Sequence, residues 1–311
     1  MPEGIGASGL VGIAFEVTAG TYVAPTKYVP IRSESLKFNQ EFFDRRDIRG
    51  VADIVGLVKS NGAVDGDLEM FVLPDALPYF LHASRGAVVK SGAGPWTYVW
   101  TPGHGALPTT GRTLSITVVR AGIVFGYTGC VVGASQYSLD TGVLIVRHSI
   151  VGRNESDQSV PSPTWATTVP FGMGMYTVEL PLSTVVCDTD QFTLNIDDNA
   201  QPEFRLCGDT GAEFVRFGER NVEANVQRDF VSKADYATFR ALTQQSLRVK
   251  VSNGAQADVQ FDIPAAVKDS YEVGLSGQGD LVRATVNYRG IYDATATAGA
   301  KITVINNENI T

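Results

Sequence analysis

Few residues of this chain have the types and spacing that catalysis or metal binding requires. The three histidines, His82, His104 and His148, are far apart, and none has a second metal-ligating residue at helical or strand spacing. We interpret each as an isolated polar residue on the surface or in a groove. A GxGxxG match at residues 4–9 has no strand before it to present amides to a pyrophosphate, so a flexible leader is the simpler interpretation.

The acidic clusters also have simple interpretations. Asp188 with Asp190, or residues 197–199, could offer oxygens to calcium, but neither group has the spacing of a calcium-binding loop. Residues 197–199 follow an alternating strand and are typical of a turn, in which Asp and Asn side chains cap their own backbone.

Two carboxylate pairs could be nominated for glycoside hydrolysis, Asp67 with Glu69 and Glu219 with Glu223. Pairs at such spacing occur on many solvated strands, so they carry no weight. The sequence has no GxSxG, HExxH or Walker A motif. We therefore predict that the protein is not an enzyme and that it uses no metal or cofactor.

Composition favours strands over helices. Gly is abundant, with 32 residues, and Val, Ile, Thr, Tyr and Phe recur in short runs. The uncharged run over residues 121–139 contains several glycines, and we interpret it as two strands joined by a Gly turn, not as a membrane span. The net charge of −8 disfavours a protein that grips phosphates, whereas a weakly acidic wall would let DNA slide past without sticking.

The cysteines indicate a reducing compartment. Cys130, Cys187 and Cys207 are an odd number without a CxxC pair, which argues against a disulfide framework or a zinc site. The first residues have no basic region followed by an apolar stretch, so we expect no secretion signal and folding in the cytoplasm.

A weak internal repeat divides the chain into two halves. In each half, a strand, an excursion and a second strand precede a short helix, and an alternating strand and a closing strand follow it. The predicted segments are 33–42, 50–61, 63–73, 75–84, 113–119 and 143–152 in the first half, and 191–197, 202–218, 221–228, 232–243, 246–251 and 281–290 in the second. Chance similarity between β-proteins of similar composition is the alternative.

The repeat also matches individual residues. Phe38 corresponds to Leu194, Tyr79 corresponds to Tyr236, and two alternate strand positions correspond as well, Leu68 and Met70 with Ala224 and Val226.

Both predicted helices have start signals. Residues 74–75 place a proline and an acid at the first start, and Ser232 with Asp235 is a variant of the capping box at the second. Tyr236, Phe239 and Leu242 lie three residues apart and predict one apolar stripe packed against a sheet.

The predicted organisation is therefore two tandem β-sandwiches or split barrels, each flanked by one short helix. The first covers residues 1–152 and carries an inserted loop, 86–111, whose Trp96, Trp100 and His104 we expect on the surface. Residues 153–170 are polar with three prolines and are predicted to be a linker. The second covers residues 171–311 and ends in a mobile tail from residue 294.

Eight short segments follow one another in a characteristic order. They are 28–36 (YVPIRSESL), 45–50 (RRDIRG), 64–68 (VDGDL) leading into 73–81 (LPDALPYFL), 127–130 (YTGC), 192–196 (FTLNI), 218–222 (GERNV) and 288–293 (YRGIYD). Their order resembles the tail tube (major tail) proteins of long-tailed, non-contractile bacteriophages.

The resemblance implies a structural virion protein of the tail, made and assembled in the host cytoplasm. Its β-sandwich strands would join those of neighbours into a barrel, and rings would stack into the conduit for DNA ejection. Because duplicated members of the family resemble a six-fold ring built from three chains, it implies a homotrimeric ring with pseudo-six-fold symmetry in preference to a hexamer. The implied partners are other copies, the tape-measure protein, the tail terminator and initiator proteins, and genomic DNA that passes without specific binding.

Two excursions carry apolar residues that a monomer would leave exposed, so we predict that they contact an adjacent ring or chain. A plain β-hairpin folded back on its own sheet is the alternative. The candidate contact residues are Ile48, Ile54, Val55 and Leu57 in the first excursion, and Phe214, Val215 and Phe217 in the second.

Other classes of β-protein fit parts of the sequence. One is a different virion protein, such as a tail-tip, decoration or capsid-associated protein. Another is a carbohydrate-binding module that uses Trp96, Tyr98 and Trp100, because alternate residues share one strand face. A hydrolase is the third.

Overall fold

The computed structural model of the chain describes residues 9–50, 52–103, 113–140, 142–159, 163, 165, 170–172, 174–206, 210–254, 257–275, 277 and 279–310. Residues 4–8 of the GxGxxG match, His104, Cys207, and residues 160–162, 164 and 166–169 of the predicted linker lie outside these residues. Among the helices described, neither is long and apolar enough to cross a membrane.

Twenty-one strands and two short helices make up the described fold. In the first half they are β1 (Leu10–Phe15), β2 (Lys27–Tyr28), β3 (Ser33–Glu34), β4 (Lys37–Arg45), β5 (Gly56–Phe71), α1 (Leu77–Ala83), β6 (Gly86–Ser91), β7 (Trp96–Pro102), β8 (Leu114–Arg120), β9 (Ile123–Asp140), β10 (Val143–Gly152) and β11 (Asn154–Asp157). In the second half they are β12 (Tyr176–Glu179), β13 (Val185–Val186), β14 (Thr189–Asp197), β15 (Ala200–Glu203), β16 (Phe214–Phe217), β17 (Asn221–Asp229), α2 (Ala234–Arg240), β18 (Gln245–Ser252), β19 (Asp258–Gly274), β20 (Arg283–Gly290) and β21 (Lys301–Asn306). The mainly β prediction is confirmed.

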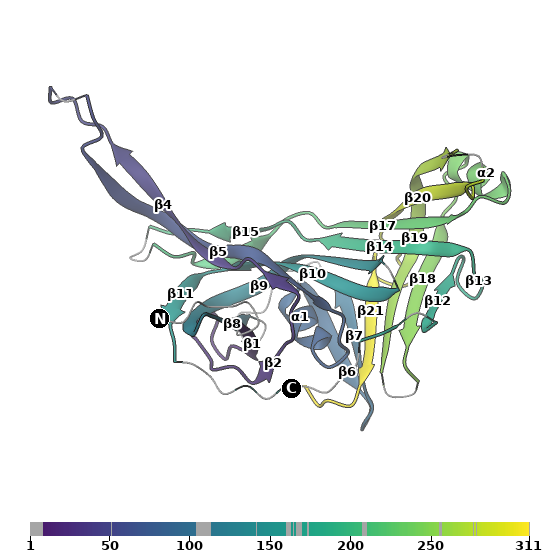
Figure 1. The fold of residues 1–311 in the computed structure, drawn as a ribbon, viewed down its shortest axis with the longest axis horizontal. Helices are drawn as coiled ribbons and strands as arrows, with labels where there is room; N and C mark the ends of the chain where they lie inside the picture. Colours follow the sequence, from purple (N-terminus) through teal and green to yellow (C-terminus); the bar gives the residue numbers. More distant parts are fainter. Residues whose placement is uncertain are drawn as a thin grey trace.

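Strands pair in the same order in the two halves. The first half follows β4–β5–β10–β9–β8–β1, and the second follows β14–β17–β20–β19–β18–β12, all antiparallel. The long strand β9 runs through two sheets, whereas β19 pairs first with β18 and β21 and then with β20 in one sheet. Each of these strands changes partner near a β-bulge. Figure 1 shows the large sheet across the middle of the molecule, with α1, β1, β2 and β8 below it.

The large sheet is one continuous surface because β9 also pairs with β14 and thereby joins the two halves. Its two faces differ sharply. One row of neighbouring residues across the strands is buried: Met70, Val146, Tyr137, Leu194, Ala224, Tyr288 and Lys268. The adjacent row, on the opposite face, is polar throughout: Ser33, Glu69, Arg147, Gln136, Asn195, Glu223 and Arg289. This period-2 alternation places the core on one side of the sheet only.

One hydrophobic core spans both halves. The Tyr137 and Phe261 rings, from β9 and β19, lie 4.7 Å apart between centroids. β21, the last strand of the chain, pairs with β19 and also with β7 of the first half. The halves are therefore packed together at the described residues.

Three of the expectations about local structure that were wrong concern β9, the inserted loop and the C-terminal tail. Residues 123–140 form the single strand β9, because its glycines allow other groups to approach closely instead of making a turn. A Cβ on Gly129 would lie 2.5 Å from the Arg153 side chain, and one on Gly133 would lie 2.9 Å from the Ala200 Cβ. The predicted inserted loop contains the hairpin β6–β7, whose residues Tyr98 and Trp100 are buried.

The third concerns the C-terminal tail, which we predicted to be mobile. Its residues 301–306 form β21, and the Ile310 side chain is buried. The Ile310 amide donates to the Tyr98 hydroxyl at 2.8 Å. The contacts of β21 and Ile310 with a segment some two hundred residues earlier fix the tail, and such contacts leave no local sequence pattern.

The predicted helices are present but begin later and end earlier than expected. In α1, Pro78 occupies the first turn and Leu77, Phe80 and Leu81 are buried. In α2 no residue is buried, and the predicted capping box is wrong because Asp235 binds Lys268 instead. The predicted apolar stripe is only partly packed, since the Leu242 side chain is exposed.

Candidate assembly surfaces

A long two-stranded arm projects from the body of the protein (Figure 1). It forms because β4 and β5 remain paired from Lys37–Asp65 to Arg45–Gly56, well beyond the edge of the core. The sequence predicted an interruption of the strands here, which was wrong: the excursion is a continuation of the ladder. The arm's apolar side chains face solvent, and the most exposed of them are Phe42, Phe43, Ile48, Ile54, Leu57 and Val58.

The first four candidate contact residues all lie on this arm. Ile48, near its tip, is completely exposed, and Ile54 and Leu57 are exposed too. Val55 is half-buried, and its amide donates to the Arg45 carbonyl at 3.0 Å. The arm thus presents several apolar side chains that its own fold does not cover.

The second set of candidates lies on a separate hairpin, β15–β16. Phe214 is exposed, with Arg205 stacked over its ring at 5.4 Å, whereas Val215 and Phe217 are half-buried. In the segment that joins β15 to β16, the Thr210 carbonyl accepts a hydrogen bond from the Gly62 amide at 2.8 Å. This hairpin therefore lies against the base of the arm, and it leaves Phe214 the most exposed of its three candidates.

Two of the strand edges that have no partner in the described sheet belong to β4 and to the last part of β19. β4 pairs with β5 alone, and the last residues of β19, from Ser270 to Gly274, pair with β20 alone. Unpaired strand edges expose backbone amides and carbonyls that another strand can bind. Sequence reasoning did not locate these edges, because an edge is defined by the sheet order and not by composition.

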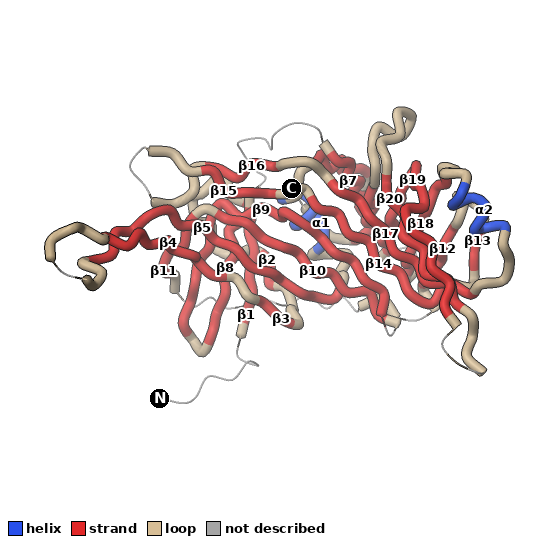
Figure 2. The backbone as a smooth tube through the Cα atoms, turned by 90° about the horizontal axis from the view of Figure 1, so that it is seen from above, coloured by secondary structure: helices blue, strands red, loops and turns tan. Residues whose placement is uncertain are grey.

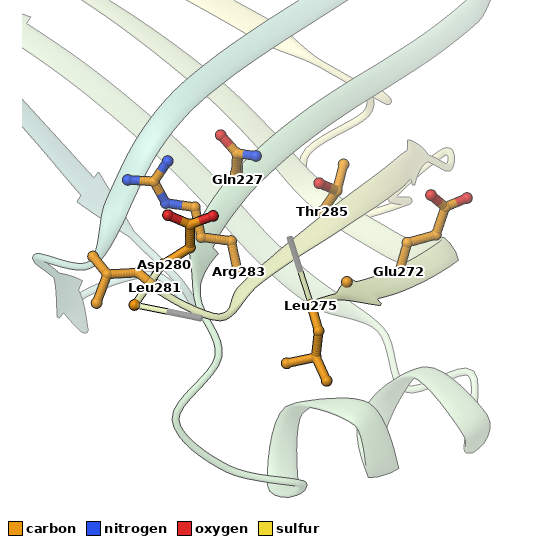
Figure 3. Close-up of a pocket in the computed structure, with 9 residues that line it drawn as sticks. Gln227, Glu272, Leu275, Asp280, Leu281, Arg283 and Thr285 are labelled. Carbon is orange, nitrogen blue, oxygen red and sulfur yellow. The ribbon is translucent and has the colours of Figure 1, made fainter. Parts of the chain in front are cut away.

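A hollow of about 800 Å³ lies over the sheet face formed by β17, β20 and the end of β19. Figure 3 shows Glu272, Leu275 and Arg283 around it, with Gln227 and Thr285 from the neighbouring strands. Leu275 and Val273 are exposed here although they are apolar. The edge of β19 is thus bordered by open space and by uncovered apolar side chains.

The helix α2 is fixed beside this edge by a buried lysine. The Lys268 ammonium ion pairs with the Asp235 carboxylate and donates to the Asp235 carbonyl at 2.9 Å and to the Thr238 hydroxyl at 2.6 Å. Burial lowers the pKa of Lys268, and the Asp235 carboxylate opposes that shift. Tyr236 and Phe239 of α2 contact Tyr271 of β19, with Tyr236 still exposed.

The residues considered for chemistry have structural roles in the described fold. Asp188 pairs with Arg228 at 2.8 Å, and the buried Asp198 pairs with Arg220 at 2.6 Å. The turn at residues 197–199 is confirmed, since the Asn199 amide donates to the Asp197 carboxylate at 2.8 Å.

The surface position expected for His148 was wrong. This histidine is fully buried, stacks on Phe80 with centroids 4.5 Å apart, and shares a 2.8 Å hydrogen bond with the Ser135 hydroxyl. Burial lowers the pKa of the imidazole to about 3. His148 is therefore a neutral core residue at physiological pH.

An exposed aromatic platform for carbohydrate is not present at the predicted position. Tyr98 and Trp100 point into the core and only Trp96 is partly exposed, with the Lys90 ammonium 4.3 Å from its ring centroid.

Comparison with known proteins gives a family. The family described as phage tail tube protein matches residues 6–301, nearly the whole chain. No curated protein matches the chain. Together with the mainly β fold, the match shows that this chain belongs to the phage tail tube protein family and is a structural component of the virion tail that assembles with copies of itself into the tube.

Proposed function

We propose that three copies of this chain close one ring of the tail tube, with the two halves of each chain acting as two of six similar units. The observation that carries the proposal is the shared pairing order of the halves, β4–β5–β10–β9–β8–β1 and β14–β17–β20–β19–β18–β12. A short helix follows the second strand of each series, α1 after β5 and α2 after β17.

The ladders also suggest how residues of the halves correspond. If β10 and β20 are matched at their last residues, Gly152 and Gly290, their neighbours Val64 and Val222 correspond. Leu68 then corresponds to Val226, which differs by two residues from the match made on the sequence. An offset of two keeps every side chain on the same face of its strand, so the period-2 pattern alone does not detect it.

We further propose that the polar face of the large sheet lines the lumen. In the part of the chain that the structure describes, neither helix packs on this face at the polar row. Its acids are balanced by arginines: Arg147 pairs with Asp67 at 2.5 Å, and Arg32 pairs with Glu69 at 3.1 Å. The net charge predicted an acidic lumen wall, but the acidic and basic side chains on this row balance one another. Such a wall offers DNA phosphates no cationic patch to bind, which suits passage without specific binding.

The projecting arm is proposed as the contact between stacked rings. It extends away from the sheet (Figure 2). It carries the exposed side chains of Ile48, Ile54 and Leu57. Burial of such side chains in an adjacent ring would remove apolar surface from water, at about 25 cal/mol per Å². In keeping with the family, we also propose that the tape-measure protein occupies the lumen during assembly in the host cytoplasm, and that terminator and initiator proteins bind the tube ends.

Microscopy with mass measurement tests this function. Purified protein concentrated until it polymerises should give hollow tubes in negative stain, and rings released from them should have three times the subunit mass of 33.3 kDa in native mass spectrometry. Rings of six chains would refute the three-chain proposal, and solid or amorphous polymers would refute the conduit.

A further inference from the structure

We propose that the free edge of β4 in one protomer pairs with the free edge of β19 in the next, in the register that β14 and β9 already use within the chain. The partner is a second copy of this chain. The inference rests on the proposed ring and specifies the residues that close it.

The junction inside the chain serves as the template. β9 pairs with β14 so that Ala134 lies opposite Asp197 and Gln136 lies opposite Asn195. Just past the last pair, the Asp198 amide donates to the Gly133 carbonyl at 2.9 Å. One junction of this kind joins the halves, so a ring of identical chains needs the same junction between chains.

The bulges locate the corresponding residues of β19. In β9 the extra residue is Gly133, and Ala134 follows it. In β19 the extra residue is Asp269, and Ser270 follows it. Counting from the bulge, Glu272 takes the place of Gln136.

The ladders locate the corresponding residues of β4. In each half, one row of paired residues across three strands includes the residue just before the last glycine of β10 or of β20. They are Lys37, Asp65 and Val151 in the first half, and Asn195, Glu223 and Arg289 in the second. Lys37 therefore takes the place of Asn195, and Asn39 takes the place of Asp197.

The resulting register brings complementary side chains together. Lys37 of one protomer lies opposite Glu272 of the next, and Asn39 lies opposite Ser270. On the core face, the partly buried Phe38 meets Tyr271, which already contacts the α2 aromatic side chains. Both Lys37 and Glu272 are exposed and neither has an ion pair among the described residues, so each is free to pair with the other.

The intermolecular ladder is shorter than its template. At Leu36 the backbone leaves the strand: its amide donates to the Glu34 carboxylate at 3.1 Å, and its carbonyl accepts from the Tyr127 hydroxyl at 3.0 Å. Pairing with the neighbour is therefore confined to residues 37–40 of β4 and 269–272 of β19, and several junctions must close together to hold a ring.

Cross-linking tests the register directly. Cys187 and Cys207 are first replaced by serine, while the buried Cys130 stays. Lys37→Cys protein and Glu272→Cys protein are then mixed at high concentration and treated with a short bismaleimide. The matched control replaces Glu272→Cys by Glu223→Cys, which lies on the same sheet face but on the inner strand β17.

We expect the Lys37/Glu272 mixture to form covalent dimers at least about tenfold faster than the control mixture, because the paired Cβ atoms would lie about 5 Å apart. Equal rates in the two mixtures would overturn the proposal. A chain carrying both cysteines should form closed covalent trimers.

Charge reversal provides a second readout that needs no cysteine. Lys37→Glu or Glu272→Lys alone should raise the concentration needed for assembly by about two- to fivefold, and the double variant should restore it. No restoration in the double variant would contradict the pairing. Cross-linked trimers that never form tubes would support the pairing of β4 with β19 and refute assembly into a tube. Tubes in which Lys37→Cys and Glu272→Cys do not cross-link would support tube assembly and refute the pairing.

Discussion

Tyr137 and Phe261 pack against each other across the junction of the two halves, with ring centroids 4.7 Å apart. Tyr137 belongs to β9, which joins the sheets of the two halves, and Phe261 belongs to β19. The Phe261 ring also contacts the Phe192 ring, with centroids 6.3 Å apart. Both side chains are fully buried. The halves therefore share their core, and we expect them to unfold together.

Removing one of these rings should destabilise the whole subunit. Phe261→Ala should lower the free energy of unfolding by about 3–5 kcal/mol, because it leaves a cavity in the shared core. Denaturation followed by fluorescence and by circular dichroism should still give one coincident transition. The matched control, Phe43→Ala on the exposed arm, should change stability by less than about 0.5 kcal/mol. Two separate transitions, with only the later half affected, would contradict the shared core.

Burial of His148 predicts a dependence of stability on pH. The imidazole has a pKa of about 3 in the folded protein and 6.5 as its ordinary value. Between these values the unfolded chain binds a proton that the folded chain does not, so stability falls as the pH decreases from about 6.5 to about 3, by up to about 1.4 kcal/mol per pH unit.

The variant His148→Gln isolates this effect. It should be less stable at neutral pH but should lose less stability than the parent protein between pH 6 and about 4, measured by urea denaturation. An identical slope in the two proteins would show that His148 does not titrate between the folded and unfolded states.

The ion pair between the buried Asp198 and the partly buried Arg220 should hold the halves together. Arg220 also donates to the Arg85 carbonyl at 2.6 Å and to the Gly103 carbonyl at 3.2 Å, both in the first half. Asp198→Ala should cost about 3–5 kcal/mol, because it leaves a buried guanidinium without its counterion. The exposed pair Arg46–Asp44 is the control, and Asp44→Ala should cost less than about 1 kcal/mol. Similar costs at the two sites would refute the role of burial.

Shortening the arm should separate stacking from folding. Residues 43–58 can be replaced by Asn-Gly, which joins the paired residues Phe42 and Lys59 through a two-residue turn. The shortened protein should unfold at nearly the same denaturant concentration as the parent and should form no tubes in negative stain. Loss of folding would show that the arm is part of the core instead.

Single substitutions on the arm refine the same prediction. Ile48→Ser or Leu57→Ser should weaken tube formation, whereas Ile123→Ser, at an exposed position outside the arm, should not. Equal effects at Ile48 and Ile123 would indicate a general loss of apolar surface and not a specific contact.

Much of the element order could be predicted from the sequence, because strands and helices have local periods. The paired strands that precede α1 and α2, and the closing strands β10 and β20, lie close to the predicted ranges. Trp100 could not be placed this way. Its hairpin is buried because β7 pairs with β21, which lies some two hundred residues later in the chain.

The assembly surfaces were only partly predictable. Exposed apolar residues such as Ile48 stand out in a polar, Gly-containing segment, so composition alone indicated them. Lys37 and Glu272 did not stand out, because charged residues on strands are common and their importance depends on which edges lack a partner. Asp235 misled the capping prediction, since its carboxylate binds Lys268, which lies more than thirty residues later on another strand.

The most direct test is a cryo-electron microscopy map of the assembled tube at a resolution that separates strands. Our account predicts three chains in each ring, the polar row of the sheet facing the lumen, and residues 37–40 of each chain beside residues 269–272 of its neighbour. Six chains in a ring, or a β19 edge that faces solvent in the tube, would contradict it.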